Sequence, residues 1–370
     1  MDDTEQIKYD YWWAGMDRAC PGSVRKTALS AGGTKRLYEM DREELITIEG
    51  ISEKYAEDII RKRQNWDIDA EYEKLLGMDI GFIPYYDDRY PRRLKRTQGY
   101  PFGLFCMGSL PEDDVYCVAV IGARNCSEYG RMMARRLSSD LAGYGVAIVS
   151  GMAYGIDGIS QEAALNAGGR SYAVLGCGVN TCYPASNRVL YERLKENGGV
   201  LSEYGIYTRP SARLFPPRNR IISGLADILL VVEAREKSGT MITVDMALEQ
   251  GREVTVVPGR ITDPLSTGCN KLIKQGAMPV LSAEDIMYML DESFDNNRKT
   301  RKRPEVKLEK NEKRVYELLE PYARSIGDIS EASGLELKDV ICSLVELGIK
   351  GLAAETGKGY YVRTRDCSAV

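Results

Sequence analysis

The chain has 370 residues, which suggests two or three domains and excludes a peptide hormone or a fibre. It carries 50 Lys and Arg against 54 Asp and Glu, so the formal net charge of -4 gives no global attraction to nucleic acid or to an anionic membrane. Any site for a polyanion must therefore be a local patch of positive charge.

The sequence contains no histidine, which excludes a Ser-His-Asp triad, a histidine general base and every histidine-liganded metal site. Nine cysteines are scattered along it, and the spacing of Cys177 and Cys182 fits neither a CxxC redox motif nor a zinc knuckle. We expect reduced thiols in the cytoplasm, no metal and no cofactor. No segment reaches the ~20 apolar residues of a membrane span, so no membrane association is expected.

Residues 1–77 are predicted to form a small all-α domain. Helical patterns run over three segments: 25–31, 42–46 and 53–64. Ser52 is placed to cap the third of them. The pattern resembles a SAM-like or helix-hairpin-helix fold, whose hairpin amides contact phosphate, although a plain packing module is equally open. A connector rich in Tyr, Pro and Arg is predicted over 78–114.

Residues 115–292 are predicted to form an α/β domain, an extended Rossmann-like fold with a parallel sheet. Short apolar runs end in glycine before a helical pattern, at VYCVAVIGAR, VAIVSGMAYGID, SYAVLGCG, ILLVVEAREKSGT and EVTVVPG. In such sheets the ligand crevice lies beyond the carboxyl ends of the strands, where helix N-termini present free N–H groups. The glycines let the main chain approach an anion closely. The repeated strand, glycine and helix pattern therefore favours a phosphate-binding site at the carboxyl edge of the sheet.

Basic residues are expected to converge at that edge. Arg124 follows the first strand, Arg218 and Arg220 precede a helix in FPPRNR, and Lys237 starts another helix. Guanidinium groups bind phosphate bidentately and keep their charge when partly desolvated. An alternative for Arg218 and Arg220 is ion pairing within the crevice, with partners among Asp157, Glu203 and Glu233. Four aromatic rings near these loops are candidates for base stacking: Tyr154, Tyr183, Tyr204 and Phe215. They rank below the cations because such a ring more often packs against the protein than against a base.

A charged, flexible linker is predicted over 293–311 because this segment is polar and almost without apolar residues. Three helical segments and a strand-like end follow over 312–364, in a pattern that resembles a winged helix. Its third helix exposes more carboxylates than cations, as expected for a protein-contact module rather than for a helix that reads duplex DNA.

Taken together, VAVIGARNCSEYG, AIVSGMAYGIDGISQEAAL, FPPRNRIISGLADILLVVEAREKSGTMITVDMALEQGREVTVVPG and GCNKLIKQGA resemble the DNA-processing protein A family, also called Smf, over about 100–290. The resemblance implies an extended Rossmann domain that binds single-stranded DNA, forms a homodimer and loads a RecA-type recombinase in natural transformation. By motif position it implies that the DNA-binding residues are Arg124, Gly151, Gly155, Arg170, Arg218, Asn219, Arg220, Lys237, Ser238, Gly239, Thr240 and Lys271.

The sequence departs from the family pattern at two positions. Gln161 stands where the family usually has a histidine, which weakens any role for an imidazole there. Tyr154 stands where a basic residue is common, which puts one phosphate contact in doubt but leaves a stacking role open.

We expect binding without catalytic residues, and two enzyme classes are weighed against it. A nucleotide phosphoribohydrolase of the PGGxGTxxE type needs a glutamate where Thr243 stands. An NAD-dependent oxidoreductase needs GxGxxG in the first strand-to-helix turn, but VIGARN offers one glycine there, and the later pair at Gly176 and Gly178 lacks the third.

Overall fold

The computed structural model describes residues 3–16, 21–291, 308–320 and 322–363. The chain divides into two compact units, Met1–Asn296 and Asn297–Val370. Within the described ranges, no helix is both long enough and apolar enough to cross a membrane.

The first unit is built on a nine-stranded sheet with the order β1-β2-β6-β5-β4-β3-β7-β8-β9. The strands from β6 to β9 in this order run parallel, and β1 and β2 are antiparallel at one end. Their bounds are β1 (Gly81–Pro84), β2 (Gly103–Gly108), β3 (Cys117–Gly122), β4 (Ala147–Ser150), β5 (Ser171–Val174), β6 (Gly198–Ser202), β7 (Ile228–Glu233), β8 (Glu253–Val256) and β9 (Met278–Pro279). The predicted α/β class with a mostly parallel sheet is confirmed.

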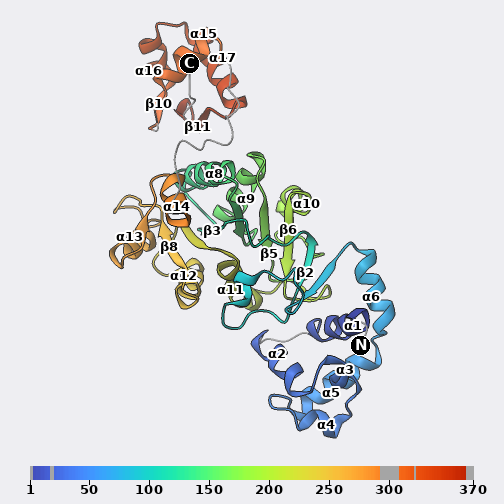
Figure 1. The fold of residues 1–370 in the computed structure, drawn as a ribbon. Coiled ribbons are helices and arrows are strands. Elements are labelled where there is room, and N and C mark those ends of the chain that lie inside the picture. The colour runs from blue at the N-terminus through green and yellow to red at the C-terminus, as the bar shows by residue number, and fades with distance from the viewer. Residues whose placement is uncertain (1–2, 17–20, 292–307, 321, 364–370) are drawn as a thin grey trace. The chain divides into compact units, whose positions relative to one another are not determined.

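Helices cover both faces of this sheet, which explains why its strands read as continuous apolar runs. In β3, Ala119 and Ile121 join one core, while Val118 and Val120 join the core of the other face. The first face is covered by α7 (Arg92–Lys95), α11 (Phe215–Leu225), α12 (Gly239–Glu249) and α13 (Thr267–Lys274). The second is covered by α8 (Glu128–Gly143), α9 (Ile156–Asn166), α10 (Arg188–Glu196) and α14 (Ala283–Leu290). Figure 1 shows α8, α9 and α10 above the sheet and α11 and α12 below it.

The N-terminal helices extend the second layer over the antiparallel end of the sheet. They are α1 (Asp3–Ala14), α2 (Pro21–Ser30), α3 (Thr34–Glu39), α4 (Arg42–Ile46), α5 (Glu53–Gln64) and α6 (Ile68–Gly77). The ring of Tyr11, 1% exposed, lies 6.3 Å from that of Phe82 in β1 and 5.9 Å from that of Phe105 in β2. The helical segment thus shares one hydrophobic core with the sheet.

Local signals located several of these helices. The predicted helices over 42–46 and 53–64 are α4 and α5, and the Ser52 hydroxyl accepts a hydrogen bond from the Tyr55 N–H at 3.3 Å, so the predicted cap is confirmed. The segment 78–114, predicted as a connector, instead supplies β1, α7 and β2. The two strands are short and flanked by Pro and Gly, so their local sequence pattern is typical of loops. Their strand conformation depends on pairing with distant segments, which the local pattern does not reveal.

Over its described residues, 308–320 and 322–363, the second unit contains three helices and a three-stranded antiparallel sheet. The elements are α15 (Lys310–Leu318), β10 (Arg324–Ser325), α16 (Ile326–Ser333), α17 (Leu337–Ile349), β11 (Ala353–Gly357) and β12 (Tyr360–Arg363), with strand order β10-β12-β11. Val315, Ile329 and Leu344 meet in its core. Of the predicted linker 293–311, residues 293–307 lie outside the described residues and the last two begin α15.

Candidate nucleic-acid interface

The loops at the carboxyl ends of β3 and β4 touch each other, and glycine makes that contact possible. Gly155 has φ 73°, and a Cβ on it would lie 2.3 Å from the carbonyl oxygen of Ala123. The Ile156 N–H donates to that same oxygen at 3.2 Å, which fixes the start of α9 beside the β3 loop. Gly155 therefore shapes the edge through backbone packing.

The helix N-termini at this edge differ in what occupies them. At α8, the Ser127 hydroxyl accepts from the Gly130 N–H at 3.0 Å, and the Ser127 N–H donates to the Glu233 carboxylate at 2.9 Å. The Glu233 carboxylate therefore binds the positive N-terminal end of α8. It does not pair with an arginine of FPPRNR, which was one of the alternatives for those arginines. At α12, by contrast, Ser238 makes no side-chain cap and Gly239 is exposed. The start of α12 is thus the more open of the two to an anion.

Arg218 lies inside the protein, with 5% of its surface exposed. Its Nη1 donates to the Gly151 carbonyl oxygen at 3.1 Å and also to that of Val174, so it ties the carboxyl ends of β4 and β5 together. Burial lowers the pKa of Arg218 to about 10, and attraction to Asp157 opposes that shift. Burial likewise raises the pKa of Asp157, against the nearby guanidinium. Arg218 therefore stabilises the carboxyl edge of the sheet from inside the protein, through its hydrogen bonds to the ends of β4 and β5.

Gly151 makes room for both of these buried groups. A Cβ on Gly151 would lie 2.5 Å from the Arg218 Nη1 and 2.8 Å from the Asp157 Oδ2. Its N–H also donates to that carboxylate at 3.2 Å. Gly151, in the SGxAxGID loop, thus leaves room for both buried charged groups.

Arg220 forms an ion pair with Glu203, the residue that follows β6. The side chains are 15% and 6% exposed. Burial raises the pKa of Glu203, and the Arg220 charge acts in the opposite direction. Asn219 lies between the two arginines, and its carbonyl oxygen accepts from the Ser223 hydroxyl at 3.3 Å. Ion pairing, the alternative kept open for Arg220, is what the structure shows.

An exposed cation and two stacked rings form what we name the edge cluster: Arg124, Phe215 and Tyr183. The guanidinium carbon of Arg124 lies 5.8 Å from the centroid of the Phe215 ring. That ring stacks on Tyr183, with centroids 5.4 Å apart and planes 17° apart. Tyr183 is 43% exposed. Because a Cβ on Gly176 would lie 2.7 Å from the Phe215 ring, glycine is needed after β5 to seat it.

The loop after β7 brings a second cation to the same edge. β3 and β7 are neighbours, so Arg124 and Lys237 leave adjacent strands on the same side. Lys237 is exposed, and the Ser238 hydroxyl donates to the Arg235 carbonyl oxygen at 2.9 Å. Thr240, in the first turn of α12, is half-buried. Lys271, on α13, pairs instead with Glu236 of this loop.

Arg170 lies at the opposite edge. It directly precedes β5, so it stands at the amino end of a strand that runs parallel to β4 and β6. There its Nη1 pairs with a Glu112 carboxylate oxygen at 2.8 Å. The structure therefore brings the other predicted residues to the carboxyl edge and separates Arg170 from them.

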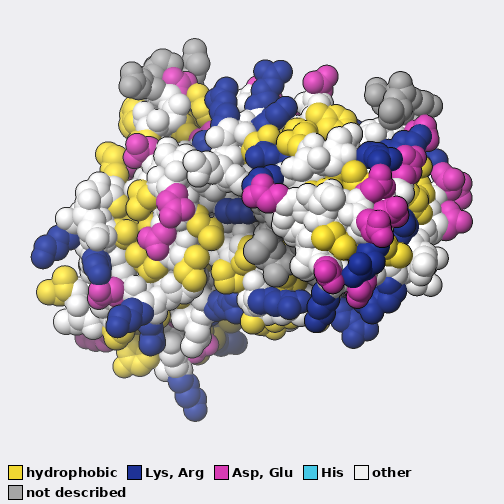
Figure 2. All heavy atoms as spheres, turned by 90° about the horizontal axis from the view of Figure 1, so that it is seen from below, with side chains coloured by type: hydrophobic (Ala, Val, Ile, Leu, Met, Phe, Trp, Pro, Cys, Tyr) yellow, Lys and Arg dark blue, Asp and Glu magenta, His cyan; other side chains and the backbone are white. Residues whose placement is uncertain are grey.

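Charge is unevenly spread over the molecular surface. Figure 2 shows one face on which Lys and Arg side chains form several groups, at the upper and the lower middle among other places, while Asp and Glu side chains are most numerous toward the right. A net charge of -4 is thus compatible with local basic patches.

Relatives of this chain agree in sequence. The family model described as DNA recombination-mediator protein A matches residues 81–291. Protein Smf of Escherichia coli (strain K12) is 39% identical over 300 residues, which are 77% of this chain and 78% of that protein. DNA processing protein DprA of Bacillus subtilis (strain 168) is 41% identical over 214 residues, 58% of this chain and 72% of that protein.

Solved structures agree in fold. DNA processing protein A from Streptococcus pneumoniae is 31% identical with a TM-score of 0.64, and the match covers 80% of this chain and 99% of that one. The Helicobacter pylori protein, whose structure concerns a single-stranded DNA binding mode, is 27% identical with a TM-score of 0.52, over 58% of this chain and 97% of that one. Sequence and fold thus confirm the resemblance: the chain belongs to the family of DNA recombination-mediator protein A, also named DprA or Smf.

Proposed function

We propose that this protein binds single-stranded DNA along the carboxyl edge of its sheet, without catalysis. The edge cluster is the observation that carries the proposal, because it places an exposed guanidinium beside a stacked pair of rings. A guanidinium binds a phosphate, and ring faces stack on bases of any sequence. The Helicobacter pylori relative, whose structure concerns a single-stranded DNA binding mode, supports the same ligand.

In this proposal the candidate residues take two roles. Direct contacts with the strand come from the edge cluster and from the open start of α12, namely Arg124, Tyr183, Phe215, Lys237, Ser238, Gly239 and Thr240. Lys271 lies at the margin of that loop through its pair with Glu236. The remaining residues of this edge hold its shape from within, namely Gly151, Gly155, Arg218, Asn219 and Arg220.

Two buried groups favour binding over glycosidic hydrolysis. Thr243, which stands where the phosphoribohydrolase motif has its glutamate, is 3% exposed. The carboxylate of Glu203, at the same edge, is held in the ion pair with Arg220. A general acid or nucleophile for that reaction needs a carboxyl group in reach of the sugar.

We further propose that the bound strand is passed to a RecA-type recombinase in the cytoplasm, during natural transformation, by a homodimer. The family description as a recombination mediator supports this role. Two linked sites also raise avidity for one strand. The second unit is proposed to be a winged helix that contacts protein, because α17 and its N-cap expose Glu336, Asp339 and Glu346 against Lys338.

The affinity for an oligonucleotide is expected to fall steeply with salt and to change little with base sequence. Each phosphate contact on a single strand adds about -0.7 to the slope of log K against log salt, so two contacts alone predict about -1.4. Fluorescence anisotropy of a labelled oligothymidylate and of a mixed-sequence oligonucleotide, titrated from low to high salt, measures both properties. Affinity that stays flat across the salt series would refute the proposal.

A further inference from the structure

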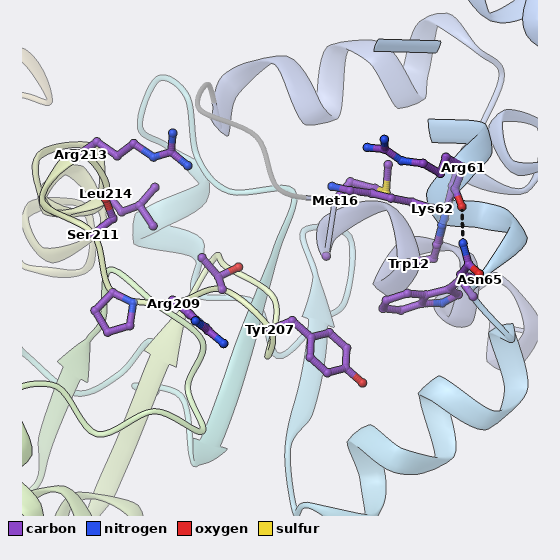
Figure 3. A pocket seen from close by; sticks show the side chains of 14 residues that line it. Trp12, Met16, Arg61, Lys62, Asn65, Tyr207, Arg209, Ser211, Arg213 and Leu214 are labelled. Atoms are coloured by element: carbon purple, nitrogen blue, oxygen red, sulfur yellow. Dashed lines mark hydrogen bonds between the residues drawn. The ribbon is translucent and has the colours of Figure 1, made fainter. Parts of the chain in front are cut away.

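A groove separates the N-terminal helices from the segment that follows β6 within the first unit. It is lined by α1 and α5 on one side and by residues 207–214 on the other, and its volume is about 700 Å³. Sites of this size hold small organic ligands. Figure 3 shows Arg61 and Lys62 on one side of it and Arg209 and Arg213 on the other. We name it the basic groove.

The charge of the basic groove has one sign. Among the described residues that line it, four are Lys or Arg and none is Asp or Glu. Arg61 and Lys62 share the Asp58 carboxylate on their own helix. Arg209 and Arg213 are exposed, and within the described part of the chain neither has an ion pair or a side-chain hydrogen bond. Two guanidinium groups are therefore available to an anion.

Aromatic rings lie in the same groove. Tyr207 is 54% exposed, and its ring centroid lies 6.2 Å from that of Trp66, with the planes at 86°. The Tyr207 hydroxyl donates to the Glu71 carboxylate at 2.6 Å, which holds the ring in place. Rings beside cations form the combination that tracks a single strand, because the rings stack bases while the cations hold phosphates.

The basic groove adjoins the edge cluster along the chain. Arg213 and Leu214 line the groove, and the next residue is Phe215, whose ring stacks on Tyr183. The helix η2 (Ala212–Leu214) runs directly into α11, which begins at Phe215, so no loop separates the groove from that ring. A strand that stacks at Phe215 thus has the groove directly beside it.

We propose that the basic groove is a second subsite for the same DNA strand, which continues from the edge cluster toward the N-terminal helices. The inference rests on the proposed function and adds that α5 and the segment after β6 determine how many nucleotides are bound. An oligonucleotide of about 6 residues fills the edge alone, whereas one of about 20 residues reaches the groove as well.

The double substitution Arg209→Ala/Arg213→Ala in the full chain tests this length dependence. It is expected to weaken binding of the long oligothymidylate about 25-fold at 0.1 M salt and to leave the short one unchanged. Losing two phosphate contacts reduces the magnitude of the slope of log K against log salt by about 1.4. If the two proteins bind equally at 1 M salt, this change in slope gives the stated loss of affinity at 0.1 M salt. Arg209→Lys/Arg213→Lys keeps both charges and should retain the slope.

A matched control removes two exposed arginines elsewhere: Arg135→Ala/Arg136→Ala on α8. This control should bind both oligonucleotides as the unsubstituted protein does, and melting curves verify that every variant is folded. If the unsubstituted protein binds neither oligonucleotide, the proposed function fails. If it binds both and the Arg209→Ala/Arg213→Ala variant still binds the long one equally well, only the second subsite is refuted.

Discussion

Arg218→Met is expected to lower the free energy of unfolding by about 3–5 kcal/mol, because removing one partner of a buried charge pair leaves the other uncompensated. Asp157 is 8% exposed and faces Arg218, and the carbonyl oxygens of Gly151 and Val174 also lose their donor. Urea unfolding followed by circular dichroism measures the change. An Arg135→Met variant on the outer side of α8 controls for the substitution itself and should change stability by less than about 0.5 kcal/mol.

The effect of Arg218→Met should depend on pH in a defined direction. Burial raises the pKa of Asp157 in the folded protein, so its contribution favours the folded state below the unfolded pKa and is lost as pH rises through the folded value. Without Arg218 the destabilisation is therefore smaller in mild acid than at neutral pH. Asp157→Asn added to Arg218→Met should restore part of the stability at neutral pH. A destabilisation that is equal at all pH values would contradict the electrostatic attraction between Arg218 and Asp157.

The combined substitution Arg124→Ala/Tyr183→Leu/Lys237→Ala is expected to weaken binding of single-stranded DNA by about a hundredfold or more. Two lost phosphate contacts account for about 25-fold at 0.1 M salt, and a lost stacking ring adds about 1–3 kcal/mol. All three side chains are at least partly exposed, so the fold should survive. Anisotropy with oligothymidylate and with a mixed sequence should show equal relative losses.

Arg170→Ala is the internal control for the edge variants. Arg170 is an exposed arginine at the opposite edge of the sheet, paired with Glu112. Its removal should leave the affinity within about twofold and the salt slope unchanged. If Arg170→Ala weakens binding as much as Arg124→Ala does, the strand does not lie along the carboxyl edge.

The class of fold follows from local pattern, because β3, β4, β5 and β7 are apolar runs buried on both faces, each with a glycine in or soon after its end. The pattern did not reveal β1 and β2. Their place in the sheet depends on pairing with β6, which is about a hundred residues away along the chain.

The interior position of Arg218 had a signal in the sequence. Arg218, Ile221, Ile222 and Leu225 recur at the spacing of one helical face, and all four are buried in α11. Helical phase thus separates Arg218, which packs inward, from Arg220, which pairs with Glu203 at the same edge. Residue type alone made the two arginines equivalent candidates.

The edge cluster was only half accessible to sequence reasoning. Arg124 follows from the turn after β3, but the stacking of Phe215 on Tyr183 joins segments more than thirty residues apart. The sequence marks Tyr183 and Phe215 as candidate stacking rings, but neither belongs to the predicted DNA-binding residues. No periodicity within either segment encodes that contact, which depends on β5 and β6 being neighbours in the sheet.

Photo-cross-linking of an oligonucleotide carrying 5-bromodeoxyuridine, with the linked peptides identified by mass spectrometry, tests most directly whether the strand lies along the carboxyl edge. The expected links are to Tyr183 and Phe215, whose rings are placed to stack on bases. Their yield should fall when salt is raised. Links confined to the peptide around Arg170, or to the second unit, would contradict this account of the protein.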